Sequence, residues 1–268
     1  MDLHDYQDVA ENYDTYLDVM YSENDSYEGF QDFYLALAKK YGEKGTIDIA
    51  TGTGAVLLTL LQAGLDAEGT DLSGAMCAVA RKKAAAMGLE ARIFEANMTD
   101  LHPGRKYSFA VIARSGFMHL LTPQDQRKAL LSIRDCLTED GVLSLNTFAP
   151  WPPLQAEQMR TTPDDYSFRL EYTNHEGHRE RIYNAITFDP VTQVMHGNWK
   201  FETLGDDGQV TGTRIRPLAM RQTYVQELLY LFELCGYEVI DRFGDYHGSR
   251  EDTGRYVWVV RKKLCPGF

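Results

Sequence analysis

Hydrophobic and polar positions alternate with two different periods along residues 46–148. Short apolar runs of strand length are separated by longer stretches in which leucine and alanine recur at helical spacing. Strands that alternate with helices predict an α/β fold with a doubly wound, parallel sheet. The predicted strands are "GTIDIATGTG", "DAEGTDLS", "EARIFEAN", "KYSFAVIARS" and "GVLSLNTFAP".

The helix ends in this region carry local sequence signals. Ser73 and Thr122 are predicted N-caps, and Pro123 follows Thr122 at the first helical position, where its missing N–H costs nothing. Gly64 and Gly88 are predicted to end the two helices that precede them, because glycine tolerates the left-handed conformation there. These signals place the loops between strands and helices.

The pattern changes outside this region. Residues 1–45 are tyrosine-rich and helical in pattern, and we expect this cap to pack over the functional edge of the sheet. Residues 151–222 contain β-prone segments separated by turn-forming residues, which predicts an inserted antiparallel meander. Residues 223–268 return to one helix and a strand pair that would complete the core formed by residues 46–150.

Composition narrows the class of ligand. The formal net charge is −12, which disfavours a nucleic-acid partner because the phosphate backbone is repelled. No apolar run approaches the roughly 20 residues of a membrane span, and the acidic N-terminus is not a signal peptide, so we expect a cytoplasmic protein without a membrane partner. The cysteines lack C-x-x-C spacing, against a zinc site or a disulfide framework.

The segment "IDIATGTGAV" places Gly52 and Gly54 directly after an apolar run. A dinucleotide fingerprint would have a third glycine where Leu57 stands, so this loop alone is a weak indication of NAD. Asp71 ends the next predicted strand, where an acid accepts hydrogen bonds from a ribose diol. That geometry suits any adenosine-containing cofactor, and the alternative is a turn aspartate beside the cap Ser73.

Taken in order, these segments resemble the class I S-adenosylmethionine-dependent methyltransferases. "IDIATGTG" resembles the glycine-rich first motif, "GTDLSGAM" the second, "ANMTDL" the third, "YSFAVIARSGFMHLLTPQDQRKAL" the fourth and "LTEDGVLSLNTFAP" the fifth. The resemblance implies a seven-stranded Rossmann-like sheet, S-adenosylmethionine as cofactor and S-adenosylhomocysteine as product. Two positions depart from the family pattern: Ala50 stands where glycine is commonest, and Asn97 stands where many members have aspartate.

The resemblance also assigns residues to the cofactor. Asp48 would help position the amino-acid end, Asp71 would bind ribose, and Leu72 and Met98 would flank adenine, with Asn97 reaching its amino group. Taken alone, Leu72 and Met98 would more often be core residues and Asn97 a turn residue, so the assignment depends on their order across several strands. The complete set of expected cofactor-binding residues is Tyr13, Asp48, Ala50, Gly52, Gly54, Asp71, Leu72, Asn97, Met98, Arg114 and Ser115.

Methyl transfer needs a well-placed acceptor, and a protein base only if the acceptor arrives protonated. His119 follows the fourth strand at the edge where ligands bind, and it is the candidate base; a loop-capping histidine is the alternative. Tyr13, in the motif "ENYD", would close over the cofactor or orient the acceptor. His175 and His178 in "HEGH" lack metal-site spacing and are expected at a hairpin tip, so no metal is predicted.

The inserted meander resembles, in layout, that of aminosugar N,N-dimethyltransferases, where such an insertion encloses the acceptor and can contribute to subunit contacts. We therefore expect a methyltransferase that acts on nitrogen or oxygen of a small-molecule acceptor, with a homodimer as a further expectation. The alternatives are a nicotinamide-dependent oxidoreductase, which would reuse Gly52, Gly54 and Asp71, and a catalytically silent cofactor-binding module.

Overall fold

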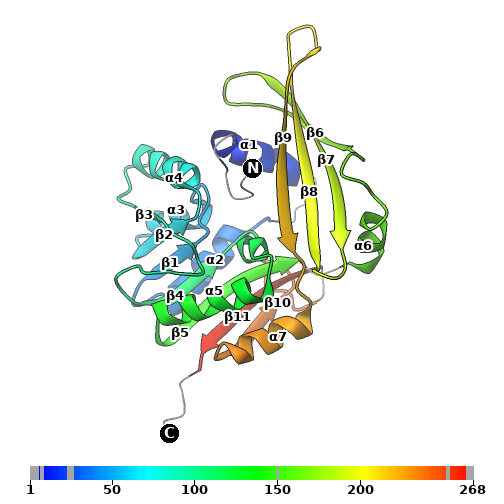
Figure 1. The fold of residues 1–268 in the computed structure, drawn as a ribbon. Helices are drawn as coiled ribbons and strands as arrows, with labels where there is room; N and C mark the ends of the chain where they lie inside the picture. Colours follow the sequence, from blue (N-terminus) through cyan, green and yellow to red (C-terminus); the bar gives the residue numbers. More distant parts are fainter. Residues whose placement is uncertain (1–5, 7–8, 23–26, 149–150, 252–253, 264–268) are drawn as a thin grey trace.

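The computed structural model describes residue 6 and residues 9–22, 27–148, 151–251 and 254–263, which form two sheets with flanking helices (Figure 1). The larger sheet has seven strands in the order β10-β11-β5-β4-β1-β2-β3. β1 to β5 pair in parallel, and β11 runs antiparallel to both β5 and β10. Its strands are β1 (Thr46–Ile49), β2 (Ala67–Asp71), β3 (Arg92–Glu95), β4 (Tyr107–Ile112), β5 (Leu137–Phe148), β10 (Tyr237–Phe243) and β11 (Arg255–Lys262).

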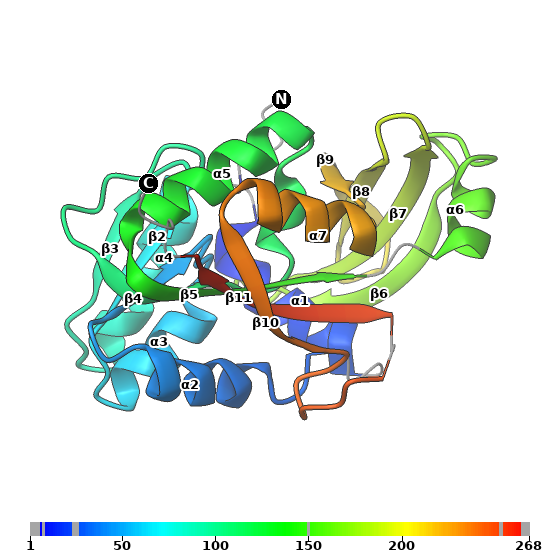
Figure 2. The same cartoon turned by 90° about the horizontal axis from the view of Figure 1, so that it is seen from below.

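Helices cover both faces of this sheet (Figure 2). Its central strands are buried almost throughout, and such strands read as near-continuous apolar runs because neither face meets water. The α/β fold with a doubly wound, mostly parallel sheet is therefore confirmed. On one face pack α2 (Phe30–Tyr41), α3 (Ala55–Gln62) and α4 (Gly74–Ala86), and on the other α5 (Pro123–Cys136) and α7 (Val225–Leu234).

The predicted helix ends are confirmed. The hydroxyl of Ser73 accepts a hydrogen bond from the backbone N–H of Met76, and that of Thr122 accepts one from the N–H of Asp125 at 3.1 Å. Gly64 and Gly88 adopt φ values of 74° and 67°, the left-handed region that glycine enters without a Cβ clash. These caps fix where α4 and α5 begin and so where the loops at the sheet edge lie.

The second sheet is the predicted antiparallel meander, with four strands in the order β6-β7-β8-β9. It stands above one end of the larger sheet, with α6 beside it (Figure 1). The helix α6 (Pro152–Gln158) was not predicted, although its proline at the first turn is typical of a helix start. The strands are β6 (Ser167–Thr173), β7 (Arg179–Asp189), β8 (Val194–Leu204) and β9 (Val210–Arg221).

The N-terminal region divides into two parts. The short helix η1 (Ala10–Asn12) and α1 (Tyr13–Ser22) lie between the small sheet and α4, where Tyr16 packs against Tyr172 and Phe201 (Figure 1). In contrast, α2 packs beside α3 on a face of the large sheet. Most of α2 therefore does not cover the functional edge as expected for residues 1–45, because its apolar side chains bury a face of the sheet; only its first residue, Phe30, lines the cavity at that edge.

The predicted boundaries at residues 45, 150 and 222 stay predictions. Within the described ranges, no helix is both long and apolar enough to cross a membrane.

Candidate functional site

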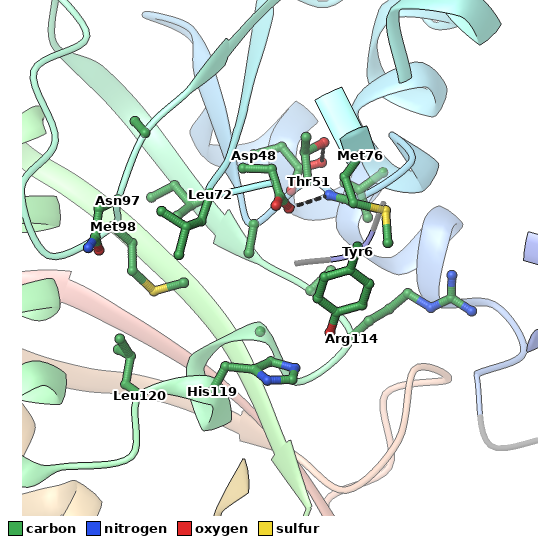
Figure 3. Close-up of a pocket in the computed structure, with 18 of the residues that line it drawn as sticks. Tyr6, Asp48, Thr51, Leu72, Met76, Asn97, Met98, Arg114, His119 and Leu120 are labelled. Carbon is green, nitrogen blue, oxygen red and sulfur yellow. Dashed lines mark hydrogen bonds between the residues drawn. The ribbon is translucent and has the colours of Figure 1, made fainter. Parts of the chain in front are cut away.

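A cavity of about 500 Å³ opens where β1, β2 and β4 reach their carboxyl ends (Figure 3). This is the edge at which open α/β sheets bind ligands, because the loops that leave parallel strands diverge there. The N-terminal region closes the cavity with the side chains of Tyr6 and Tyr13. Of the predicted site residues, those that line it are Tyr13, Asp48, Ala50, Gly52, Asp71, Leu72, Asn97, Met98, Arg114 and His119.

Asp48 presents a buried carboxyl group at the base of the cavity. Its Oδ2 accepts hydrogen bonds from the hydroxyl of Thr51 at 2.7 Å and from the N–H of Leu57 at 3.0 Å. Its Oδ1 is buried and has no hydrogen-bond partner among the described residues. Burial raises the pKa of Asp48 to about 7, with a smaller contribution in the same direction from Asp71, although the hydrogen bonds from Thr51 and Leu57 act to lower it.

The loop after β1 turns through three left-handed residues, since Ala50, Gly52 and Gly54 have φ values of 55°, 57° and 89°. A Cβ added at Gly52 would meet nothing within 4 Å, so the backbone of this residue borders open space in the cavity. Gly54 does not line the cavity: a Cβ there would lie 3.2 Å from Leu58 Cγ and 3.3 Å from Ala80 Cβ. The glycine at this position lets α3 approach α4 closely.

Ala50 stands where the family pattern has glycine most often, and its backbone shows why glycine suits this position. Its φ of 55° lies in the left-handed region. An L-residue with a Cβ is destabilised there by roughly 1–2 kcal/mol. Glycine at this position, the commonest residue in the family pattern, would relieve that strain.

Asp71 joins the first two loops of the site. Its Oδ2 accepts a hydrogen bond from the N–H of Gly52 and its Oδ1 from the N–H of Ser73, both at 2.8 Å. A carboxylate can accept about four hydrogen bonds, so these contacts are compatible with a ribose diol as a further donor. The neighbouring side chain of Leu72 is 42% exposed, an apolar surface at the cavity for a flat ring to cover.

In Figure 3, Leu72 lies between Asp48 on one side and Asn97 and Met98 on the other. The side-chain oxygen of Asn97 accepts hydrogen bonds from both the N–H and the hydroxyl of Thr99, each at 2.9 Å. The expected contact from this oxygen to an adenine amino group would therefore compete with Thr99. The amide N–H groups of Asn97 are the donors that an adenine ring nitrogen could use instead.

Residues after β4 form the opposite wall. His119 ends the short helix η2 (Gly116–His119) and lies across the cavity from Asp48 (Figure 3). Arg114, with a φ of 51°, places its guanidinium within 6.0 Å of the ring centroids of Tyr13, Tyr27 and Phe30. The positive charge is thus held over aromatic faces at the cavity wall.

Ser115 is not brought to the cavity. It is buried and exchanges hydrogen bonds with Asn146, whose Oδ1 accepts from the Ser115 N–H and whose amide donates to the Ser115 hydroxyl, both at 3.0 Å. The side chain therefore ties η2 to β5. Its expected contact with the cofactor has no support in this geometry.

Hydrogen bonds hold the first helices to the site. Asp14 accepts a hydrogen bond from the hydroxyl of Thr53 at 2.7 Å and pairs with Lys83 at 2.9 Å. On the other side, Asn12 accepts hydrogen bonds from the N–H and the ring of His175 at the tip of the β6–β7 hairpin. The segment "HEGH" is therefore a hairpin tip as expected, and among the described residues no cluster of potential metal ligands occurs.

Sequence reasoning missed several residues of the cavity. Thr51 and Thr53 stand inside the quoted glycine loop, and Met76 follows the predicted N-cap Ser73, so their positions were available from the motif. Tyr6 and Phe30 had no local signal, because they reach the cavity only through the path of the N-terminal region.

The arrangement fits S-adenosylmethionine. The unpartnered oxygen of Asp48 can compensate a cationic amino-acid end, and the open space at Gly52 admits close approach of the backbone. Asp71 is placed for a ribose, and Leu72 and Met98 offer apolar faces to a purine. No pyrophosphate-binding basic group is required for this ligand.

Comparison with known proteins agrees with this reading. Residues 47–141 match a protein family described as a methyltransferase domain. A glycine/sarcosine N-methyltransferase from Parasynechococcus marenigrum (strain WH8102) is 27% identical over 265 residues, which cover 97% of this chain and 86% of the relative. The match thus extends through both the core and the insertion.

Solved structures are similar across nearly the whole chain. An S-adenosylmethionine-dependent methyltransferase from Clostridium acetobutylicum superposes with a TM-score of 0.77 at 16% identity, covering 94% of this chain and 98% of the other. An amino pentose methyltransferase from Micromonospora echinaspora, solved with S-adenosylmethionine bound, gives a TM-score of 0.67 at 18% identity over 93% of this chain and 97% of the other. Residues 47–141 therefore match a methyltransferase domain, and the chain has the fold of S-adenosylmethionine-dependent methyltransferases, which confirms the resemblance and agrees with the cofactor predicted from the sequence.

Proposed function

We propose that this protein transfers a methyl group from S-adenosylmethionine to a nitrogen or oxygen atom of a small-molecule acceptor. The observation that carries the proposal is one cavity of about 500 Å³ in which the expected cofactor-binding and catalytic residues meet. Asp48, Gly52, Asp71, Tyr13 and His119 all line it, and His119 lies across from Asp48 (Figure 3). A cavity closed by the N-terminal region favours a small acceptor over a macromolecule.

Each side chain has a distinct task in this proposal. When bound, S-adenosylmethionine supplies an electrophilic methyl group. Asp71 would hold the ribose, and the carboxyl of Asp48 would balance positive charge at the amino-acid end. His119 would accept the proton that the acceptor loses, and Tyr13 would orient the acceptor from the N-terminal side. Most of the rate enhancement would come from fixing the acceptor close to the methyl group.

Relatives favour nitrogen as the acceptor atom. The relative from Parasynechococcus marenigrum is named for N-methylation of glycine and sarcosine, and the similar structure from Micromonospora echinaspora for methylation of an amino pentose. The net charge of −12 argues against a nucleic-acid substrate. A cytoplasmic location, no membrane partner and a homodimer formed through the small sheet are further parts of the proposal.

Titration calorimetry tests the cofactor. Wild-type protein should bind S-adenosylmethionine and S-adenosylhomocysteine but not NAD. Gly52→Val should weaken binding of both by about tenfold or more, because its side chain would occupy the open space at the loop. Gly64→Val is the matched control, since Gly64 is also left-handed with nothing within 4 Å but lies at the end of α3, outside the cavity.

Two outcomes would contradict the cofactor assignment: tighter binding of NAD, or unchanged affinity in Gly52→Val. Transfer of a labelled methyl group to a panel of small amines and alcohols then separates an enzyme from a silent binding module. Labelling of none of these compounds, in protein that binds S-adenosylmethionine, would count for the silent module.

A further inference from the structure

Two arginines lie on the same face of β9, because residues two apart in a strand point the same way. Arg214 and Arg216 both face the side of the small sheet on which α1 packs, since Arg214 contacts Phe201 and Arg216 contacts Tyr6. Arg214 is neutralised: its Nη1 and Nη2 donate to the two carboxylate oxygens of Glu180 at 2.8 and 3.0 Å. Arg216 has a different environment.

The guanidinium of Arg216 is buried without a counter-ion among the residues that the structure describes. The residue is 7% exposed, and its Nε and Nη2 are buried with no hydrogen-bond partner among the described residues. No ion pair to a described carboxylate involves it. The guanidinium stacks on the ring of Tyr6, whose centroid lies 3.7 Å from Arg216 Cζ.

Such a charge is costly to the folded protein. Removing a guanidinium from water is unfavourable unless hydrogen bonds or an opposite charge compensate it. Stacking on a tyrosine compensates only part of the cost and leaves the in-plane N–H groups unused. A hydrophobic side chain would fill the same space more favourably, so an arginine here points to an anionic partner outside the described chain.

The position of Arg216 indicates where that partner would bind. Tyr6, on which the guanidinium stacks, lines the cavity of the candidate site, and β9 also contacts η2, the helix that carries His119. An acceptor that places its reacting atom near His119 could therefore extend toward β9. Arg216 does not itself line the cavity but stacks behind Tyr6, so the acceptor would reach it past the Tyr6 ring.

We propose that Arg216 binds a carboxylate group of the methyl acceptor, so that the substrates are amines that carry a carboxylate. The inference rests on the proposed methyltransferase function. The Nε and Nη2 edge of a guanidinium matches the two coplanar oxygens of a carboxylate in a bidentate pair. A phosphate dianion would need a second cation, and Arg214 is already paired with Glu180.

Calorimetry on protein saturated with S-adenosylhomocysteine tests this proposal with matched probes. The carboxylates are glycine, β-alanine and 4-aminobutanoate, and the neutral counterparts are ethanolamine, 3-aminopropanol and 4-aminobutanol. At least one carboxylate should bind about tenfold or more tightly than its alcohol, and Arg216→Met should weaken its binding by about 10- to 100-fold. Arg216→Lys keeps the positive charge but cannot form the bidentate pair, so its affinity for the carboxylate should lie between those of wild type and Arg216→Met.

Arg169→Met is the matched control, because Arg169 is an exposed arginine on β6 of the same sheet and its loss changes the net charge equally. This variant should bind the carboxylates like wild type. Affinity for S-adenosylhomocysteine should be unchanged in all variants. Failure to bind S-adenosylhomocysteine at all would count against the methyltransferase function, whereas carboxylates that bind no better than alcohols would overturn the role of Arg216 alone.

Thermal unfolding without ligand supplies a second readout. Because no described residue supplies a counter-ion in the free protein, Arg216→Met should have a Tm equal to or above that of wild type. A lowered Tm with unchanged carboxylate binding would make Arg216 a structural residue and overturn the proposal. Tighter binding of aminomethylphosphonate than of glycine would also overturn it, in favour of a phosphate-bearing acceptor.

Discussion

Replacement of Asp48 by asparagine should change how stability depends on pH. The carboxyl group of Asp48 is 1% exposed, and its Oδ1 has no partner among the described residues. Burial raises its pKa to about 7, against an ordinary value of 3.8 in the unfolded chain. Asparagine keeps the shape and can still accept the hydrogen bonds from Thr51 and Leu57.

The direction of the change in unfolding free energy with pH follows from proton release on unfolding. Between pH 4 and 7 the folded state keeps the proton of Asp48 while the unfolded state has lost it, so unfolding releases a proton and rising pH favours unfolding. One pKa unit corresponds to 1.36 kcal/mol. Wild type should therefore lose at most about 4 kcal/mol of unfolding free energy, relative to Asp48→Asn, as the pH rises from 4 to 7.

Urea denaturation of both proteins at several pH values, without ligand, measures this difference. Asp66→Asn is a control of opposite sign, because a hydrogen bond from Arg105 lowers the pKa of Asp66, so its contribution to stability is lost as the pH falls. The difference between wild type and Asp66→Asn should therefore grow with pH. A flat difference between wild type and Asp48→Asn would refute the assignment of an uncompensated buried carboxyl at position 48.

Three other substitutions probe the site. Asp71→Ala should weaken binding of S-adenosylmethionine and S-adenosylhomocysteine equally, by about 10- to 100-fold, since both carry the ribose diol; wild-type affinity in calorimetry would remove Asp71 from the site. His119→Ala should lower kcat with little change in cofactor affinity, whereas an unchanged kcat would leave His119 structural. Ala50→Gly should raise the free energy of unfolding by up to about 1 kcal/mol, and a decrease in urea denaturation would contradict strain at this φ.

The core of the fold was predictable because its signals are local. Each strand of the parallel sheet is a buried apolar run, and each helix start is set by side chains such as Ser73 and Thr122 within one turn. The meander was predictable for the same reason, since turn-forming residues such as those of the "HEGH" tip separate its strands. The path of residues 1–45 was not, because helical periodicity does not tell which surface a helix covers.

The cofactor-binding side of the candidate site could be predicted from the order of the motifs along the chain. Asp48, Gly52 and Asp71 come together because parallel strands deliver their following loops to one edge of the sheet. Ser115 illustrates the limit of that reasoning. It follows the same strand as Arg114, but the turn directs its side chain to Asn146 on β5, a contact that no sequence spacing encodes.

The acceptor side depends on contacts between distant segments. Tyr6 and Arg216 are far apart in sequence and stack only because η1 and α1 lie between the small sheet and α4, where Asn12 of η1 binds His175 and Asp14 of α1 binds Thr53 and Lys83. These two consecutive helices therefore contact the insertion on one side and the glycine loop on the other. If Arg216 holds the acceptor, movement of the two helices would alter the acceptor pocket and the cofactor loop together, because Asn12 and Asp14 tie them to both.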